Sequence, residues 1–158
     1  MKINTTRFGE IEIDESKIIT FTQGPIGFSH ASKYIKLSNQ LGESTPFRWL
    51  QSIDHPDMAF VIVDPISFYP EYQVNLQKDE VADLEMEEVE DIIVRTVVVI
   101  PSNVHDMTAN LRAPILINEK SGKAKQVILA DSDYSLQYKI MHEMEKRVEE
   151  IKKNAVAQ

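Results

Sequence analysis

The run from Ile92 to Ile100, IIVRTVVVI, constrains the fold of this chain more than any other segment. Every residue in it except Arg95 carries a branched Cβ, which favours extended backbone and packs well on a pleated surface. Apolar side chains at successive positions are typical of a strand that is covered on both faces. The run therefore predicts a buried central strand, which Pro101 ends.

Short strand-like runs fill most of the remaining sequence, and turn signals recur about every ten residues. The other expected strands are Lys2–Phe8, Glu10–Asp14, Lys17–Phe21, Tyr34–Leu37, Phe47–Ile53, Ala59–Val63, Tyr72–Gln77, Leu111–Asn118 and Lys125–Ala130. Hairpins are expected at Gly9, at Asp54–Asp57 and at Gly122, a shaped turn at Gln23–Phe28 and a polar loop at Gln40–Pro46. This spacing favours a sandwich or small barrel over alternating βαβ units.

Helices are expected at only two places. Lys78–Leu84 is predicted to be a short acidic helix. After Tyr134 the apolar residues alternate as in a strand, but a stripe from Leu136 to Ile151 also has helical spacing. We expect an extended piece near Tyr134 and a helix from about Met141, which either docks on its own domain or presents its stripe to another chain.

These patterns predict a mainly β chain. The expected fold is a compact, single-domain, β-barrel-like structure of about nine strands, with a short acidic helix and a C-terminal helical tail. The barrel domain is expected to cover residues 1–140 and the tail residues 141–158.

The charge of the chain is concentrated in one segment. The net charge is −8, and eight acids with no base among them lie between Asp79 and Asp91, while the remaining acids and bases balance. Nucleic-acid backbones are bound through Lys and Arg, so direct nucleic-acid binding is not expected. The acidic run either attracts a basic protein partner or is simply a solvated surface.

The sequence gives no sign of export or membrane insertion. It contains no cysteine, its start lacks an apolar stretch of signal-peptide length, and its longest apolar run is far short of the roughly 20 residues that span a bilayer. We therefore expect a cytoplasmic protein with no membrane anchor.

An aromatic and proline-rich stretch follows the strand that ends at Val63. We expect its residues to form an exposed rim for a protein partner, because the cluster is more aromatic than a turn needs. The rim residues are Asp64, Pro65, Phe68, Tyr69, Pro70 and Tyr72. The alternative is that Phe68 and Tyr72 cap the barrel and that only Tyr69 is exposed.

No strong catalytic or metal-binding motif is present. Asp54, His55 and Asp57, with Asp64 nearby, could bind a divalent metal or shuttle protons, but Asp-His-Pro-Asp is also the usual composition of a tight turn. The other histidines lie in unrelated segments of the sequence, and neither HExxH nor GxSxG occurs. We expect no catalytic residue, no cofactor and no metal ion.

Three sets of residues resemble the FliW family of bacterial flagellar assembly factors. The first is Gly24-x-x-Gly27-Phe28. The second runs from Phe47-x-Trp49-Leu50-Gln51-Ser52 through Pro56 and Ala59-Phe60 to Asp64-Pro65 and Tyr72. The third is Ala109-Asn110-Leu111-x-Ala113-Pro114-Ile115-x-Ile117-Asn118 followed by Gln126-Val127. They occur in the family's order from Ile3 to about Tyr138.

The resemblance implies a β-barrel-like binding protein without enzymatic activity. FliW proteins bind flagellin and, alternatively, CsrA, a dimeric RNA-binding regulator that blocks translation of flagellin mRNA. Capture of CsrA, which in the family is taken to displace RNA allosterically, relieves this repression. On this basis the exposed acids Glu87, Glu88 and Glu90 are expected to attract the basic surface of CsrA.

Overall fold

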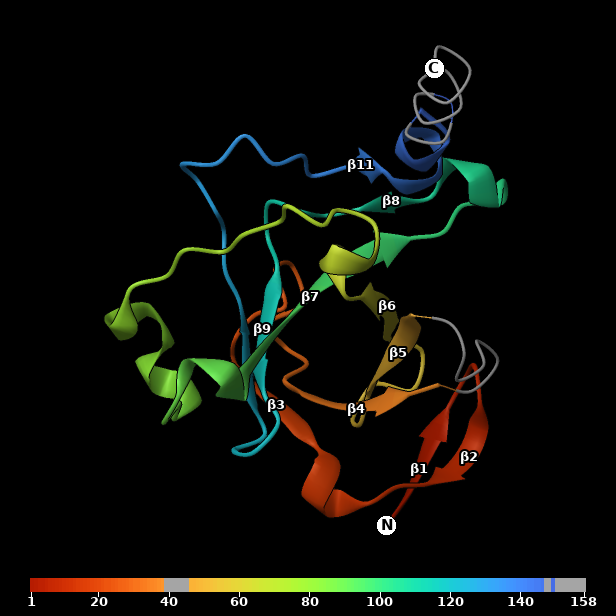
Figure 1. The fold of residues 1–158 in the computed structure, drawn as a ribbon. Helices are drawn as coiled ribbons and strands as arrows, with labels where there is room; N and C mark the ends of the chain where they lie inside the picture. Colours follow the sequence, from red (N-terminus) through yellow and green to blue (C-terminus); the bar gives the residue numbers. More distant parts are fainter. Residues whose placement is uncertain (39–45, 147–148, 150–158) are drawn as a thin grey trace.

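A closed β-barrel forms the centre of the computed structural model, which describes residues 1–38, 46–146 and 149 (Figure 1). Seven strands follow one another in the order β7-β6-β5-β4-β3-β10-β9, and β9 pairs back onto β7. All neighbours are antiparallel except β3 and β10. The barrel strands are β3 (Ile19–Gln23), β4 (Lys33–Leu37), β5 (Phe47–Ser52), β6 (Ala59–Val63), β7 (Ile92–Val99), β9 (Ile115–Asn118) and β10 (Lys123–Gln126).

Four further strands and five short 3-10 helices surround the barrel. β1 (Lys2–Thr5) and β2 (Gly9–Glu12) form a separate hairpin, and β8 (Thr108–Ala109) and β11 (Tyr138–Lys139) extend the sheet beyond β7. The 3-10 helices are η1 (Glu15–Lys17), η2 (Pro65–Ser67), η3 (Lys78–Leu84), η4 (Val89–Asp91) and η5 (Val104–Asp106). A C-terminal helix begins at residue 140. The prediction of a mainly β, barrel-like fold is confirmed.

The long apolar strand β7 is central, as its sequence predicts. One edge pairs with β6, while the other edge pairs with β9 along Ile92–Arg95 and with β8 at Val98 and Val99. Ile93 and Val97 pack against the barrel interior, and Val98 lies in the cluster on the opposite face. β7 is therefore covered on both faces and paired on both edges.

Two apolar layers flank the barrel wall. The interior is filled by alternate residues of the strands and of the β3–β4 connection, among them Ile19, Phe21, Ala31, Tyr34, Leu50, Ile62, Ile115, Ile117 and Ala124. On the outer face of β6 and β7, Val61, Val63 and Val98 are covered by an aromatic cluster and by the C-terminal helix through Ile140. The aromatic cluster consists of Phe68, Tyr69, Tyr72, Tyr134 and Tyr138.

The N-terminal hairpin agrees with its sequence pattern. Gly9 takes a φ of +72°, which residues with a side chain rarely adopt, and so allows the tight turn between β1 and β2. Ile3 and Ile13 are buried against Ile35 of β4, on the outside of the barrel. The hairpin is thus attached by side-chain packing and not by the ladder of the barrel.

Several predicted elements differ from the structure. The predicted strand Tyr72–Gln77 is wrong, because this segment has no strand pairing. It connects the aromatic cluster to η3. Lys78–Leu84 is helical, but as a 3-10 helix. The extended piece near Tyr134 forms a ladder only at Tyr138–Lys139, and the helix begins one residue before Met141. The predicted loop Gln40–Pro46 lies, except for Pro46, outside the described residues, as do positions 147–148 and 150–158 of the predicted tail.

The predicted strand Leu111–Asn118 also needs correction, and the difference has a clear chemical cause. Leu111–Asn118 was expected to be one strand, but the ladder begins only at Ile115. Asn110 Oδ1 accepts hydrogen bonds from the backbone N–H groups of Arg112 (3.2 Å) and Ala113 (3.0 Å). Pro114 has no backbone N–H and so cannot donate a hydrogen bond to a strand ladder. Residues 110–114 therefore form a break that separates β8 from β9 along the same edge of β7.

Candidate protein-binding surfaces

The predicted aromatic rim is mostly buried. Pro65, Phe68 and Tyr72 are buried, so the expectation that they are exposed is wrong. The alternative is right that Phe68 and Tyr72 are buried, but it is wrong that only Tyr69 is exposed, since Pro70 is exposed as well. The Phe68 ring stacks on Tyr138 at 5.7 Å, and the Tyr72 hydroxyl donates a hydrogen bond to the Leu111 carbonyl. Burial also raises the pKa of the Tyr72 phenol far above its ordinary value.

Only the tip of the rim reaches the surface. Pro70 is exposed and Tyr69 is half-buried, with its ring in edge contact with Tyr134 and Tyr138. Together with Asp64, these two residues are the part of the predicted rim that a partner can contact.

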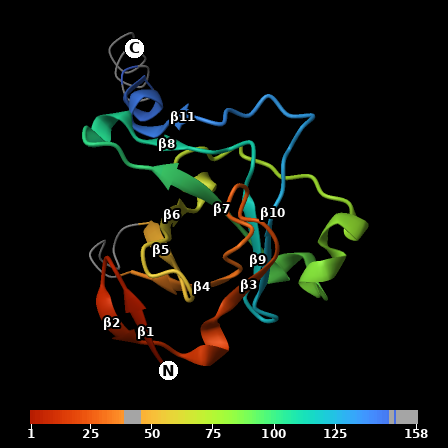
Figure 2. The ribbon, with the colours of Figure 1, turned by 180° about the vertical axis from the view of Figure 1, so that it is seen from behind.

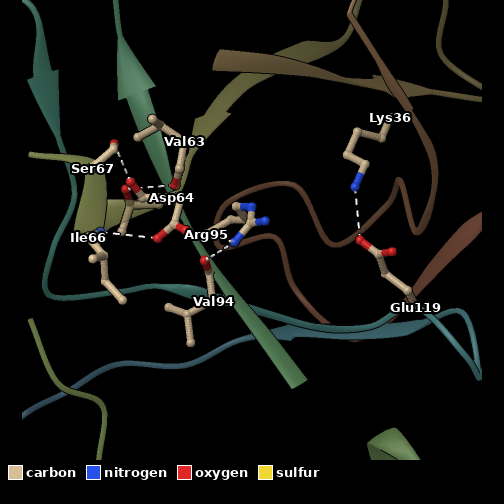
Figure 3. A network of polar contacts seen from close by, with 9 residues as sticks. Lys36, Val63, Asp64, Ile66, Ser67, Val94, Arg95 and Glu119 are labelled. Atoms are coloured by element: carbon tan, nitrogen blue, oxygen red, sulfur yellow. Dashed lines mark hydrogen bonds and ion pairs between the residues drawn. The ribbon is translucent and has the colours of Figure 1, made fainter. Parts of the chain in front are cut away.

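Asp64 is held in a structural network (Figure 3). Its carboxylate accepts the backbone N–H of Ile66 (3.1 Å) at the start of η2, and its carbonyl accepts the Ser67 hydroxyl. The other carboxylate oxygen lies 3.8 Å from the guanidinium of Arg95 on β7. Asp64 therefore caps η2 and attaches it to the barrel wall.

The acidic segment contains one buried carboxylate and several exposed ones. Glu87, Glu88 and Glu90 are exposed, as predicted. Asp91 is buried instead: it accepts the backbone N–H groups of Glu87 and Glu88 and forms an ion pair of 2.8 Å with Lys120. The Lys120 hydrogen bond and those N–H groups hold the pKa of Asp91 below its ordinary value. One acid thus fixes the loop that presents the other three.

An exposed apolar groove is present that the sequence did not indicate. It has a volume of about 660 Å³ and lies where the β3–β4 connection faces β7, β8 and the segment before β11 (Figure 2). We call it the apolar groove, and its exposed apolar side chains are Ile26, Phe28, Val99, Ile128 and Leu136. Phe60 and Val97 form its floor at the mouth of the barrel. A concave surface lined mainly by apolar side chains makes this groove a candidate binding site.

One glutamine shapes the apolar groove. The Gln126 side chain accepts the backbone N–H of Ile26 (2.8 Å) and donates to the carbonyl of Ala113 (2.8 Å), so it joins the β3–β4 connection to the break before β9. Gly24 has a φ of +94°, and a Cβ there would lie 3.3 Å from the Cβ of Gln126. Gly24, Phe28 and Gln126 were all singled out in the sequence, but nothing local showed that they meet.

The predicted polar constellation Asp54-His55-Pro56-Asp57 is a turn. The backbone N–H of Met58 donates to the carbonyl of His55, and the N–H of His55 donates to the hydroxyl of Ser52. The histidines come from separate segments of the sequence, but the fold brings them together in pairs. His30 lies beside His55, with ring centroids 5.0 Å apart, and the rings of His105 and His142 lie 4.4 Å apart.

Comparison with known proteins identifies the family. Residues 2–140 match the protein family described as FliW protein. The chain belongs to the FliW family. The curated relatives in this family include three proteins named flagellar assembly factor FliW, from Syntrophus aciditrophicus (45% identical over 145 residues, covering 92% of this chain and 90% of the relative), Alkaliphilus metalliredigens (40% over 150 residues, 95% and 92%) and Thermoanaerobacter pseudethanolicus (38% over 144 residues, 91% and 95%).

A solved FliW structure shares the fold. The crystal structure of the flagellar assembly factor FliW aligns with this chain at a TM-score of 0.80 and 34% sequence identity, covering 89% of this chain and 96% of that one. The barrel and its added strands are therefore the FliW fold. In the part of the chain that the structure describes, no helix is both long and apolar enough to cross a membrane.

The role of Gln126 can be tested by Gln126→Ala. This change leaves the N–H of Ile26 and the carbonyl of Ala113 without their side-chain partner, so we expect the free energy of unfolding to fall by about 1–3 kcal/mol. Urea unfolding followed by tryptophan fluorescence measures the difference. Gln137→Ala is the matched control, since Gln137 lines the same groove but is exposed, and it should change stability by less than about 0.5 kcal/mol. Equal effects of the two variants would contradict the bridging role.

Proposed function

We propose that this chain is a cytoplasmic flagellar assembly factor that switches between two protein partners and catalyses no reaction. In this proposal it binds flagellin and, alternatively, the translational repressor CsrA. Capture of CsrA then relieves repression of flagellin mRNA translation. Membership of the FliW family supports the flagellar role, and the apolar groove is the single structural observation that carries the binding role.

The groove suits an amphipathic helix of flagellin. Such a helix presents apolar side chains at intervals of three or four residues, and a groove with an apolar floor and exposed apolar walls can accept them. The walls supply aliphatic and aromatic anchors such as Phe28 and Leu136. The FliW resemblance implies flagellin as partner, and its terminal segments are amphipathic helices in that family.

The rim supports the same proposal in a smaller way. Tyr69 and Pro70 offer contact area at the surface, together with Asp64, while Pro65, Phe68 and Tyr72 hold them from below. Rigid aromatic side chains lose little entropy when they bind, which makes them good anchors.

The acidic loop suits CsrA. Glu87, Glu88 and Glu90 project from a loop that Asp91 fixes, and Figure 1 shows this loop on the side of the barrel away from the N-terminal hairpin. A fixed cluster of like charges accelerates encounter with a basic surface. We therefore assign the first encounter with CsrA to these three carboxylates.

Competition between the partners tests the function. The purified chain is mixed with flagellin and CsrA separately and then together, and the complexes are separated on a sizing column. We expect a complex with each partner alone and no complex that contains all three, because the switch requires exclusive binding. A stable ternary complex, or failure to bind either partner, would contradict the proposal.

Charge substitutions in the groove test the flagellin site. Ile128→Asp and Leu136→Asp change side chains that are 62% and 58% exposed, so the fold should tolerate them. A desolvated carboxylate opposes an apolar partner, and we expect flagellin to bind at least about tenfold more weakly while CsrA binding is kept. Val104→Asp is the control, since Val104 is 59% exposed but lies outside the groove. Unchanged flagellin affinity in both groove variants would remove the groove from the proposal.

Neutralising the acidic loop tests the CsrA site. The triple change of Glu87, Glu88 and Glu90 to Gln should slow association with CsrA, on the order of tenfold at low salt, and weaken its salt dependence. Stopped-flow mixing at several salt concentrations measures both. The control variant changes three exposed acids of the N-terminal region, Glu10, Glu12 and Glu15, to Gln. If both triple variants slow association equally, net charge and not this loop attracts CsrA.

A further inference from the structure

We propose that the chain binds a zinc ion between η5 and the C-terminal helix. The binding side chains come from two segments that are 36 or more residues apart in the sequence. Three of the ligands, His105, Asp106 and His142, already form a cluster, and Glu145, which contacts His105, is the fourth.

Three of the four side chains already converge. The ligand atoms of His105, Asp106 and His142 all lie within 4.8 Å of one another. His142 Nε2 is 3.2 Å from a carboxylate oxygen of Asp106, and His105 Nε2 is 2.6 Å from one of Glu145, which lies outside this cluster of three. Ligand atoms of a tetrahedral zinc site are about 3.4 Å apart when each is about 2.1 Å from the metal, so the three clustered side chains need small shifts and Glu145 must turn further toward them.

The backbone holds the two segments together independently of these side chains. β8 and β11 pair at Thr108 and Ala109, and the N–H of Ile140 donates to the carbonyl of Met107. Asn103 caps η5 by accepting the N–H of His105, which fixes that residue. In both views the connection between β7 and β8 lies beside the first turn of the C-terminal helix (Figures 1 and 2).

The spacing on each segment suits metal binding. His142 and Glu145 are three residues apart in the helix and so project from the same face. His105 and Asp106 are neighbours in η5, and each faces one residue of the helix. Each segment therefore supplies one imidazole and one carboxylate.

The donor set selects the kind of ion. Two imidazole nitrogens and two carboxylate oxygens suit Zn²⁺ and other late first-row divalent cations better than Mg²⁺ or Ca²⁺, which prefer oxygen ligands alone. Two neutral imidazoles and two carboxylates carry a charge of −2, which the cation neutralises. In binding, each neutral imidazole coordinates the metal through the lone pair of one ring nitrogen and keeps its N–H on the other, so the metal replaces the direct contact between each imidazole and its carboxylate.

The second histidine pair lacks this arrangement. His30 and His55 are also in ring contact, but among residues 1–38, 46–146 and 149 only the cluster of His105, Asp106 and His142 brings three possible ligand side chains together. His30 and His55 therefore provide a matched control within the chain.

A site with four protein ligands is structural, because no coordination position is left open for a substrate. The ion would fasten the C-terminal helix, whose Ile140 covers the outer face of the barrel, to the end of β7. Zinc binding therefore makes the attachment of this helix stronger than packing and backbone pairing alone.

Zinc titration tests the site. The full chain is treated with a chelator, dialysed and titrated with ZnCl₂ by calorimetry, and its thermal unfolding is followed with and without zinc. We expect one ion per chain, and a rise in the unfolding midpoint of about 5–10 °C at a zinc concentration roughly 100-fold above the dissociation constant. No binding, or binding without a change in the midpoint, would overturn the proposal.

Two sets of variants locate the ion. His105→Gln with His142→Gln should abolish binding, and the conservative changes Asp106→Asn and Glu145→Gln should each weaken it about tenfold or more. All four side chains are partly exposed, so these variants should fold, which their unfolding without zinc verifies. His30→Gln with His55→Gln should bind zinc like the unchanged chain. Equal loss in both double variants, or loss in neither, would place the ion elsewhere.

Discussion

The pairing of β7 with both β6 and β9 is the contact on which the rest of the structure depends. It closes the barrel, because β9 pairs along Ile92–Arg95 on one edge of β7 and β6 pairs along Thr96–Val98 on the other, and it covers a run that would otherwise expose apolar side chains on two faces. Closure is incomplete at the far end of β7. There the break at residues 110–114 interrupts the neighbouring strand, and β8 replaces β9. The apolar groove opens at this break.

Strand β10 supports both proposed binding surfaces. Lys125 donates to the carbonyl of Glu80 and to the carboxylate of Asp83, which ties the acidic segment to the barrel. The next residue, Gln126, holds the β3–β4 connection that forms one wall of the apolar groove. Adjacent side chains of one strand therefore position an acidic surface and an apolar one. This gives the two partner sites a common rigid support.

The sequence-based predictions succeeded where a local pattern has one physical cause. Alternation and β-branching placed most of the barrel strands, although β10 (Lys123–Gln126) overlaps the predicted strand Lys125–Ala130 at only two residues. Exposure was harder to predict. Phe68 and Tyr72 look like surface anchors in a proline-rich stretch, but the outer face of β6 needs apolar cover and takes them. The helical and extended patterns overlap after Tyr134, but the predicted helix start near Met141 was right to one residue, because a two-residue ladder ends where the helix begins.

The sequence by itself determined the chemistry of this protein: a β-rich chain with one acidic segment, no cysteine, and the ordered residues of the FliW family. Those properties depend on residue type and on spacing of a few positions. Only the tertiary structure decided which side chains meet. The apolar groove gathers Ile26, Val99 and Leu136 from three distant segments, and the histidine pair 105 and 142 joins a loop to a helix. Such contacts arise from barrel closure and from pairing of strand residues 20 to 31 positions apart, and no local periodicity encodes them.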